Sequence, residues 1–544
     1  MHIEFLRTTL VSDELIKRPL GKYYTPLKLA GQLSKVVADV IPHKNNLSIA
    51  DPFCGDGRLL AALSNELISR GVQRIRLEGW DIDTSAIDKC LKELVPTFAP
   101  GVTSCFYVKD SFLEEPSEKF DVIITNPPWE ILKPDKKLDS ELSLSQREQY
   151  KAHLKRYDKK LAINLPNSHP TRKFAGWGTN LSKCGLELAV KLLRQNGVLG
   201  ILLPKSVMMD HVSSNFREWL FNSVAVASLE SYPAEAKIFE QVDQDLLLGV
   251  FKKQKPKRSY FSFVKYDSRL EPKISTPILF CPESLNKTHY TLPLIEGNNY
   301  VTQKFQNLKR LHDFEAPGKL WLGRELDETG YSNFVMDKGK HHFLKGRMIT
   351  RYSFQPEALY VNEAKRKLPP TAVLERIAWR DIARRTQERR VKACIIPVNC
   401  VTGNSLHVAH TYGSSDRLKA LLVVLNSFVF EYQVRASNTT GHISLNCVRN
   451  VKIPNLFESS ACELLSVCYD EFKSGREAFT EELLEIVVAK LYGLEKFEFE
   501  KLLESFDKVP TAYKLDLLSN KAWQINTTIL CKKSLITTLL HSAN

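Results

Sequence analysis

The sequence predicts an α/β protein in which a mostly parallel sheet carries helices on both faces. Through the first half of the 544 residues, apolar runs of strand length alternate with amphipathic helical patterns, and polar residues follow the runs where strands end. This rhythm breaks at the charged, proline-containing stretch 252–258, and helical patterns return from residue 458. We therefore expect a parallel-sheet domain over residues 1–255, a mixed α+β domain over 256–457 and a helical C-terminal segment over 458–544.

The elements of the first domain follow one another in a regular order. Buried strands are expected at 47–53, 74–83, 104–110 and 120–129, and an amphipathic helix follows each of the first two. Thr84 is placed to cap the second of these helices. Parallel strands joined by helices bring the carboxyl ends of all four strands to one edge of a sheet, which is where such sheets bind ligands.

The rest of the first domain continues this pattern after an interruption. Residues 130–178 form a long insertion rich in Lys, Arg, Asp and Glu, which is either a solvated helical excursion or a cover over the ligand. A helix over 186–197, a strand over 198–204 and a helix through 216–221 then resume the alternation.

Composition favours an acidic partner and excludes several classes of protein. Hydrophobic residues make up 43% and charged residues 25%, so wholesale disorder is excluded. Lys and Arg total 76 against 62 Asp and Glu, a net charge of +14 that favours nucleic acid as partner. No run approaches the roughly 20 apolar residues that span a bilayer. The 11 cysteines form no C-x-x-C pair, which favours a cytoplasmic protein with reduced thiols and without a zinc site.

Acidic residues stand where three successive strands end. Asp51 is followed by a turn containing Gly55 and Gly57, and Leu60 occupies the position where a dinucleotide-binding turn has its third glycine. Asp81 can accept hydrogen bonds from ribose hydroxyls, and Asp110 can accept one from an adenine amino group. Such acceptors suit a ligand with adenine, ribose and a cationic tail better than one with phosphates. Asp81 taken alone could instead be a solvated loop residue or a helix cap.

The fourth strand ends in Asn126-Pro127-Pro128-Trp129, the most specific motif of the chain. The prolines fix the backbone and remove N–H donors. The side-chain oxygen of Asn126 and the carbonyl of Pro127 can then both accept from one amino group, and Trp129 offers a flat face on which a base can stack. The alternative is a plain proline turn after a strand.

These motifs, in this order and spacing, resemble those of S-adenosylmethionine-dependent amino-methyltransferases. Tyr24-Thr25-Pro26 ahead of the first strand and the extra domain at the C-terminal side resemble the gamma class of N6-adenine DNA methyltransferases of type II restriction–modification systems. The likeness continues to about residue 251 and is weaker beyond. It implies a Rossmann-like methyltransferase domain, S-adenosylmethionine as cofactor without a metal, and double-stranded DNA as partner. A separately encoded restriction endonuclease is compatible with it.

The resemblance also implies roles for individual residues. Cofactor contacts would come from the residues around the strand ends, namely Thr25, Pro26, Asp51, Phe53, Gly55, Gly57, Asp81, Asp110 and Asn126. Asn126 and Pro127 would hold the target amino group, while Trp129 and Phe239 would face the two sides of the target base. The chain departs from the family in having Trp where Tyr is commoner at 129, and Asp where Glu is frequent at 81.

The domain over 256–457 would read the DNA sequence. Arg376, Arg380 and Arg384 are predicted to share one face of a helix, and the group of arginines suited to phosphates and guanine edges is Arg347, Arg376, Arg380, Arg384 and Arg385. A solvated charged helix explains the same residues equally well.

Two other kinds of function remain open at this point. An RNA-adenine or protein-glutamine methyltransferase shares the Asn-Pro-Pro-aromatic motif, but would leave residues 259–544 unexplained. A non-catalytic DNA-binding subunit could retain the fold, but the intact Asn126–Trp129 motif and the acidic set speak against it.

Overall fold

The structure is a computed structural model that divides into two compact units, Met1–Leu294 and Ile295–Asn544. It describes residues 24–42, 44–114, 119–171, 173, 176–239, 242, 244–285, 290, 292, 301, 304–328, 331–384, 387–437, 441–457, 460–477 and 479–524. The predicted boundary at residue 255 differs from this division, because two further strands beyond that residue join the sheet of the first unit. Among the described residues, no helix combines the length and apolar character that crossing a bilayer requires.

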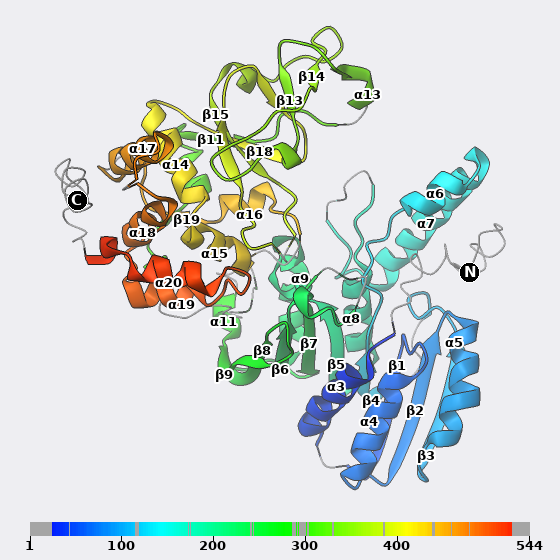
Figure 1. Ribbon diagram of the computed structural model, residues 1–544. Helices are drawn as coiled ribbons and strands as arrows, with labels where there is room; N and C mark the ends of the chain where they lie inside the picture. The colour runs from blue at the N-terminus through cyan, green and yellow to red at the C-terminus, as the bar shows by residue number, and fades with distance from the viewer. Residues whose placement is uncertain are drawn as a thin grey trace. The chain divides into compact units, whose positions relative to one another are not determined.

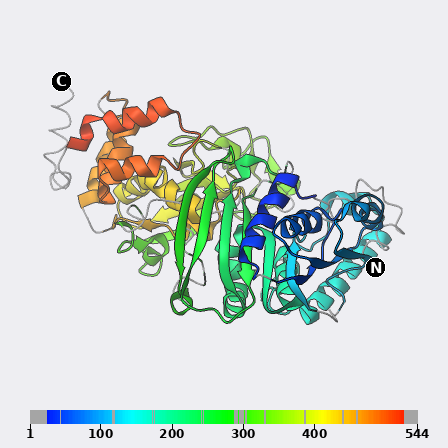
Figure 2. The same ribbon diagram turned by 90° about the horizontal axis from the view of Figure 1, so that it is seen from below.

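A nine-stranded sheet forms the centre of the first unit (Figure 1). Its strands are ordered β3 (Val102–Val108), β2 (Arg74–Asp81), β1 (Asn46–Asp51), β4 (Phe120–Thr125), β5 (Leu193–Pro204), β7 (Leu246–Lys252), β6 (Ala225–Tyr232), β8 (Ser259–Tyr266) and β9 (Pro272–Phe280). The strands from β3 to β5 pair in parallel, whereas β7 is antiparallel to β5 and β6. β8 pairs in parallel with β6, and β9 closes the edge antiparallel to β8 (Figure 2). The predicted mostly parallel α/β fold is confirmed.

Apolar clusters cover both faces of this sheet, because successive strand residues point in opposite directions. Val122 and Ile124 of β4 belong to one cluster with α3, α4 and α5, while Ile123 belongs to the other with α7, α8 and α10. The helices of this unit are α3 (Leu27–Val40), α4 (Arg58–Ser69), α5 (Thr84–Lys89), α6 (Lys136–Glu141), α7 (Leu144–Asn164), α8 (Leu181–Leu192), α9 (Ser206–Met209), α10 (Ser214–Ser223) and α11 (Pro282–Leu285).

The cap of α5 differs from the prediction by one residue. Asp83, and not Thr84, is the N-cap, since its side chain accepts a hydrogen bond from the backbone N–H of Ser85 at 3.2 Å. Thr84 is the first residue of the helix.

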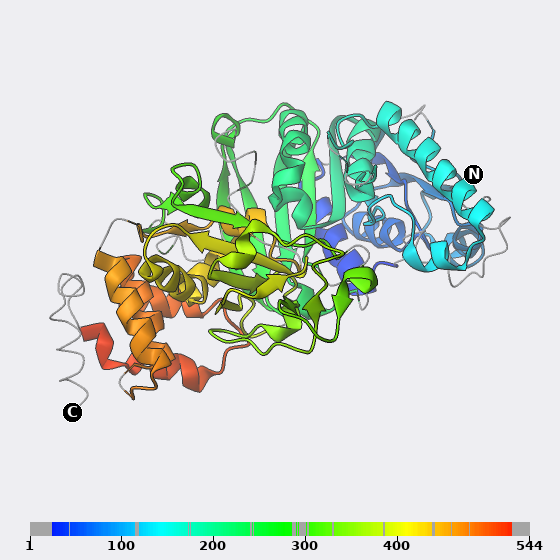
Figure 3. The same ribbon diagram turned by 90° about the horizontal axis from the view of Figure 1, so that it is seen from above.

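The insertion after β4 is built mainly from α7, the long cyan helix of Figure 3. A capping box formed by Ser143 and Gln146 begins this helix. Its buried face carries Tyr150, Leu154 and Leu161 at helical spacing, and these side chains join the apolar cluster of α8 and β4. The insertion is therefore packed on the sheet domain and is not a solvated excursion.

The second unit combines small sheets with a group of helices. One four-stranded sheet has the order β11 (Leu320–Gly323), β18 (Leu406–Thr411), β15 (Arg376–Arg380) and β16 (Ala393–Ile396). The other has the order β12 (Val335–Met336), β14 (Tyr360–Val361), β13 (His342–Leu344) and β17 (Cys400–Thr402), and β10 (Lys309–Arg310) pairs with β19 (Lys452–Ile453). The helices are α13 (Tyr331–Phe334), α14 (Ser415–Leu425), α15 (Phe428–Ser437), α16 (Leu445–Arg449), α17 (Ser460–Lys473), α18 (Glu481–Leu491), α19 (Lys496–Leu503) and α20 (Thr511–Ser519).

The arginine-rich segment of this unit corrects a prediction. Arg376 and Arg380 stand at the two ends of β15, so they do not share a helical face with Arg384. The strand forms because Ile377 and Trp379 are buried in the core and the backbone pairs with β16 and β18.

Candidate active site

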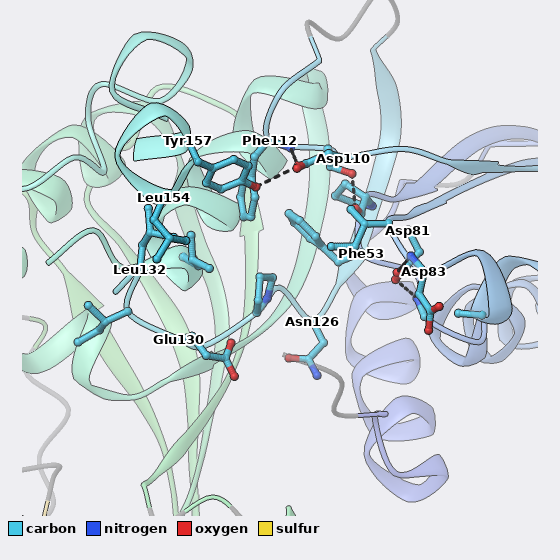
Figure 4. A pocket seen from close by; sticks show the side chains of 18 of the residues that line it. Phe53, Asp81, Asp83, Asp110, Phe112, Asn126, Glu130, Leu132, Leu154 and Tyr157 are labelled. Atoms are coloured by element: carbon cyan, nitrogen blue, oxygen red, sulfur yellow. Dashed lines mark hydrogen bonds between the residues drawn. The ribbon is translucent and has the colours of Figure 1, made fainter. Parts of the chain in front are cut away.

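A cavity of about 380 Å³ lies where the parallel strands of the first unit end (Figure 4). Every one of the first four strands contributes to its wall through the residues that follow it. The predicted site residues that line it are Phe53, Gly55, Asp81, Asp110 and Asn126. The cavity size is in the range of sites that bind small molecules and cofactors.

The glycine turn after β1 fixes the position of Asp81. Gly55 has a φ of +51° and Gly57 a φ of +78°, a region of backbone conformation that favours glycine. A Cβ atom on Gly57 would lie 2.3 Å from Cδ2 of Leu94, so a larger residue there would also displace the end of that side chain. The backbone N–H of Gly55 donates to Oδ2 of Asp81 at 2.8 Å, which ties the first strand end to the second.

Asp51 is fully buried at the end of β1 with one oxygen left over. Its Oδ1 accepts hydrogen bonds from the backbone N–H of Phe53 at 3.0 Å and from the hydroxyl of Thr125 at 2.6 Å. Its Oδ2 is buried without a hydrogen-bond partner in the described part of the chain. Burial raises the pKa of Asp51 to about 7, and the charge of Asp81 adds to this rise. A cationic group brought to Oδ2 would stabilise the ionised carboxylate.

Asp110, which follows β3, shows the same division between its two oxygens. Oδ1 accepts from the hydroxyl of Tyr157 and from the backbone N–H of Phe112, each at 3.1 Å. Oδ2 is buried and has no hydrogen-bond partner among the residues described. Burial raises the pKa of Asp110, while the two donors act in the opposite direction.

Asn126 is held so that its oxygen remains available. The amide nitrogen donates to the hydroxyl of Thr25 at 3.3 Å, and Oδ1 is buried with no partner in the described residues. Thr25 is itself buried, directly before Pro26, the N-cap of α3. Thr25 was expected to contact the cofactor, and in the structure it also bonds Asn126 of the Asn-Pro-Pro-Trp motif.

Gly185 of α8 packs closely against this motif, and the sequence analysis did not single it out. A Cβ atom at Gly185, in the middle of α8, would lie 2.3 Å from Cβ of Pro127 and 3.3 Å from Phe53. Only a glycine allows the helix to approach the loop this closely. A glycine inside a helical pattern was the available signal, because such a residue often marks a close packing contact.

The two aromatic side chains predicted to hold the target base touch each other. The ring centroids of Trp129 and Phe239 lie 5.3 Å apart with an interplanar angle of 71°, and Phe239 is buried. A base stacked between two rings needs about 7 Å, twice an ordinary contact distance. The structure therefore has no space for a base between them unless they move apart.

The insertion supplies a wall of the cavity that sequence reasoning missed. Tyr150, Leu154 and Tyr157 of α7 line the cavity, as does Glu130 directly after the motif (Figure 4). The charge-rich composition of 130–178 concealed the buried face of α7, although its aromatic and leucine residues recur at helical spacing.

The predicted DNA-binding arginines have unlike surroundings. Arg376 is fully buried and paired with buried Glu325, with Nε at 2.6 Å from Oε1, so it has no access to DNA. Arg380 donates to the carbonyls of Ile349 and Arg347 at 2.7 and 3.3 Å. Arg347 and Arg384 are exposed, and Arg385 lies outside the described residues.

Buried acceptors without partners make the cavity suited to a ligand with several donors. Asp110 and Asn126, which line the cavity, each keep one oxygen with no partner among the described residues, and buried Asp51 keeps a third. Both oxygens of Asp81 already accept hydrogen bonds, from the backbone N–H groups of Gly55 and Asp83. In the described part of the chain, no group of three or more His, Cys, Asp or Glu side chains is arranged to hold a metal ion.

Comparison with known proteins shows which proteins this unit resembles. Residues 13–276 match the model of the N-6 DNA Methylase family. The chain is 33% identical over 132 residues to the type II methyltransferase M.VspI of Vibrio sp. (strain 343), covering 24% of this chain and 30% of that one. It is 27% identical over 203 residues to the type II methyltransferase M.TthHB8I of Thermus thermophilus, covering 37% and 39%. The chain thus spans less than half the length of either relative.

Among solved structures, the type IIL restriction–modification enzyme MmeI in complex with DNA aligns over 93% of this chain and 78% of its own, with a TM-score of 0.49 and 11% identity. Residues 13–276 of this chain are thus similar to the N-6 DNA Methylase family. The predicted resemblance to N6 DNA methyltransferases of restriction–modification systems is confirmed, and the gamma class stays a prediction.

Proposed function

We propose that the chain is a site-specific DNA methyltransferase that transfers a methyl group from S-adenosylmethionine to the N6 amino group of adenine in duplex DNA. The family of residues 13–276 supports the reaction type. The observation that carries the proposal is the set of buried acceptor oxygens of Asp51, Asp110 and Asn126, which have no partner among the described residues at the end of the parallel strands. Buried polar atoms normally have hydrogen-bond partners, so these oxygens without one favour a ligand that supplies the missing donors.

The residues present fit S-adenosylmethionine. Asp51 would accept from the α-ammonium group, Asp81 from the ribose hydroxyls and Asp110 from the adenine amino group. The donor, when bound, supplies a methyl group activated by its attachment to a sulfonium centre. Because that methyl group is already reactive, the protein contributes mainly by holding the two reacting groups in line.

Asn126 and Pro127 would hold the target amino group. An exocyclic adenine amine is a poor nucleophile because its lone pair is delocalised into the ring. The amide nitrogen of Asn126 bonds Thr25, which leaves Oδ1 available. This oxygen and the carbonyl of Pro127 would each accept a hydrogen bond from the target amino group and so favour a pyramidal nitrogen. As the bond from N6 to the methyl group forms, the bond between that methyl group and sulfur would break and S-adenosylhomocysteine would leave. The extra proton of the cationic amine would pass to water, so no strong base is needed for this step.

The target base has to leave the duplex to reach these acceptors. Extrusion costs a few kcal/mol, and stacking on Trp129 would offset about 1–3 kcal/mol of it. We propose that the entering base separates Trp129 from Phe239. In this structure the two rings are in contact, with centroids 5.3 Å apart.

The second unit would read the DNA sequence, with exposed Arg347 and Arg384 as its candidate contacts. A chain of this kind would act in the cytoplasm as the modification component of a restriction–modification system, beside a separately encoded endonuclease of the same specificity.

Methyl transfer assayed in parallel on duplex DNA, RNA and protein, with labelled S-adenosylmethionine, tests the proposal. We expect label in DNA alone, as N6-methyladenine within one short sequence. Binding of S-adenosylmethionine is measured on the same sample by calorimetry. Label in RNA or in protein glutamine, or the absence of cofactor binding, would overturn the proposal.

A further inference from the structure

The insertion contacts the carboxylate that is expected to face the adenine of the cofactor. Tyr157 of α7 donates its hydroxyl to Oδ1 of Asp110 at 3.1 Å (Figure 4). That oxygen also accepts from the backbone N–H of Phe112, whereas Oδ2 is buried without a partner among the described residues. Because both donors bond Oδ1, Oδ2 is the oxygen left to accept a hydrogen bond from a ligand.

The same helix holds the chain after β3 at a second point. The amide nitrogen of Asn164, at the end of α7, donates to the carbonyl of Phe112 at 3.0 Å. α7 is in turn anchored to the segment before α8, since Asp158 accepts from Thr179 at 2.6 Å and pairs with Lys173. The position of Asp110 is thereby fixed by α7, which belongs to the insertion predicted from the sequence.

Tyr157 is suited to remain a hydrogen-bond donor at every working pH. Burial and the neighbouring charge of Asp110 both raise the pKa of its hydroxyl well above the ordinary range for tyrosine. The ring is buried in the apolar cluster of α7 and α8, so its orientation is fixed by packing.

We propose that Tyr157 is a positioning residue for cofactor recognition: by occupying Oδ1 of Asp110, it directs Oδ2 to accept from the 6-amino group of the purine. This inference rests on the proposed function, because it takes the cavity to be the cofactor site. It makes the insertion responsible for selecting a 6-aminopurine cofactor.

The test measures discrimination between two ligands. S-adenosylhomocysteine and its analogue with an unsubstituted purine, which lacks the 6-amino group, are titrated into the full chain by calorimetry. We expect the wild type to prefer the adenosyl ligand at least tenfold, and Tyr157→Phe to reduce the preference to threefold or less. A merely structural role would weaken both ligands equally and leave their ratio unchanged.

Tyr232→Phe is the matched control. Tyr232 is similarly buried in the same unit and donates its hydroxyl to a carboxylate, Glu230, at 2.5 Å, but it does not line the cavity. We expect this variant to keep the wild-type ratio of affinities. A ratio that falls equally in both variants would overturn the inference.

A second variant keeps the inference testable if Tyr157→Phe folds poorly. In Asp110→Asn, the donors Tyr157 and Phe112 should hold the amide oxygen and turn the amide nitrogen toward the ligand, which abolishes the preference for the 6-amino group. Retained preference would show that Tyr157 does not set the orientation. Failure of the wild type to bind either ligand would instead contradict the proposed function, and the inference with it.

Discussion

The carboxyl edge of the first unit and the arginine-rich strand of the second unit satisfy their polar groups in opposite ways. At the edge, Asp51, Asp110 and Asn126 each bury an acceptor oxygen without a partner in the described residues. On and beside β15, Arg376 has its guanidinium paired with Glu325, and Arg380 donates to backbone carbonyls. An unsatisfied buried group costs stability, whereas a satisfied one contributes to the fold.

This contrast separates groups kept for a ligand from groups used by the structure. Residue type alone does not make that distinction, because the arginines were suited to DNA as well as to a buried ion pair. The distinction comes from whether the group has a hydrogen-bond or ion-pair partner within the protein. The following predictions test the contrast, from the largest expected effect to the smallest.

Arg376→Ala should destabilise the second unit by about 3–5 kcal/mol, because it leaves the buried carboxylate of Glu325 unpaired. Hydrogen exchange of β15 and β18 in the full chain measures the loss. Arg347→Ala is the control, since Arg347 is 60% exposed and its bond to Glu357 is a surface ion pair worth at most about 1 kcal/mol. Equal stability of the two variants would contradict a structural role for Arg376.

Gly185→Ala should lower the rate of methyl transfer by up to about 10²-fold, because a displacement of the reacting groups by about 1 Å can cost that much. The added Cβ would lie 2.3 Å from Pro127, so the Asn-Pro-Pro-Trp loop has to shift. Single-turnover kinetics measure the rate. The matched control is Gly31→Ala on α3, where an added Cβ meets nothing within 4 Å. An unchanged rate for Gly185→Ala would show that the position of the loop is not critical.

Asp51→Asn should stabilise the cofactor-free protein above pH 7 by about 1–3 kcal/mol, since it removes a buried carboxylate with an unsatisfied oxygen. The pKa of Asp51 is raised from 3.8 to about 7 by burial. The folded state therefore holds the proton more tightly than the unfolded state, and the stability from this group is lost as pH rises between these values.

Thermal unfolding of both proteins at pH 5 and pH 8 measures the effect of Asp51→Asn. The advantage of the variant should shrink at the lower pH. It should also reverse when S-adenosylmethionine saturates the wild type. A wild type that stays more stable at pH 8 without cofactor would contradict the account of the unpartnered oxygen.

Arg347→Ala should weaken DNA binding several-fold and reduce the salt dependence of binding by about one phosphate contact. Glu357→Gln should have the opposite effect, because it removes the carboxylate that accepts two bonds from Arg347. Fluorescence anisotropy with duplex DNA at several salt concentrations distinguishes the two. Equal affinity of both variants and the wild type would exclude Arg347 from the DNA interface.

Much of the candidate site at the carboxyl edge could be predicted because its signals are local in the sequence. Each acid follows an apolar strand, and parallel pairing brings strand ends together without further information. The turn glycines and the Asn-Pro-Pro-Trp motif are also contiguous, so their proximity in the fold followed from their order along the chain.

The parts that sequence missed depend on contacts between distant residues. Tyr157 reaches Asp110 across 47 positions, and Arg376 reaches Glu325 across 51. Arginine spacing at 376, 380 and 384 fits a helix, but residues 376–379 are all buried and the segment pairs with β16 and β18 as a central strand. The predicted boundary at 255 falls in the charged stretch that joins β7 to β8, two strands of one sheet, whereas the compact units divide after Leu294.

Modified-base analysis of DNA from a host expressing the chain tests most directly whether the spare oxygens of the strand ends serve methyl transfer. The account predicts N6-methyladenine at one short sequence with the wild type, none with Asn126→Ala, and wild-type levels with Asn222→Ala, an exposed asparagine of α10. Unmodified adenine with the wild type, or full modification with Asn126→Ala, would contradict it.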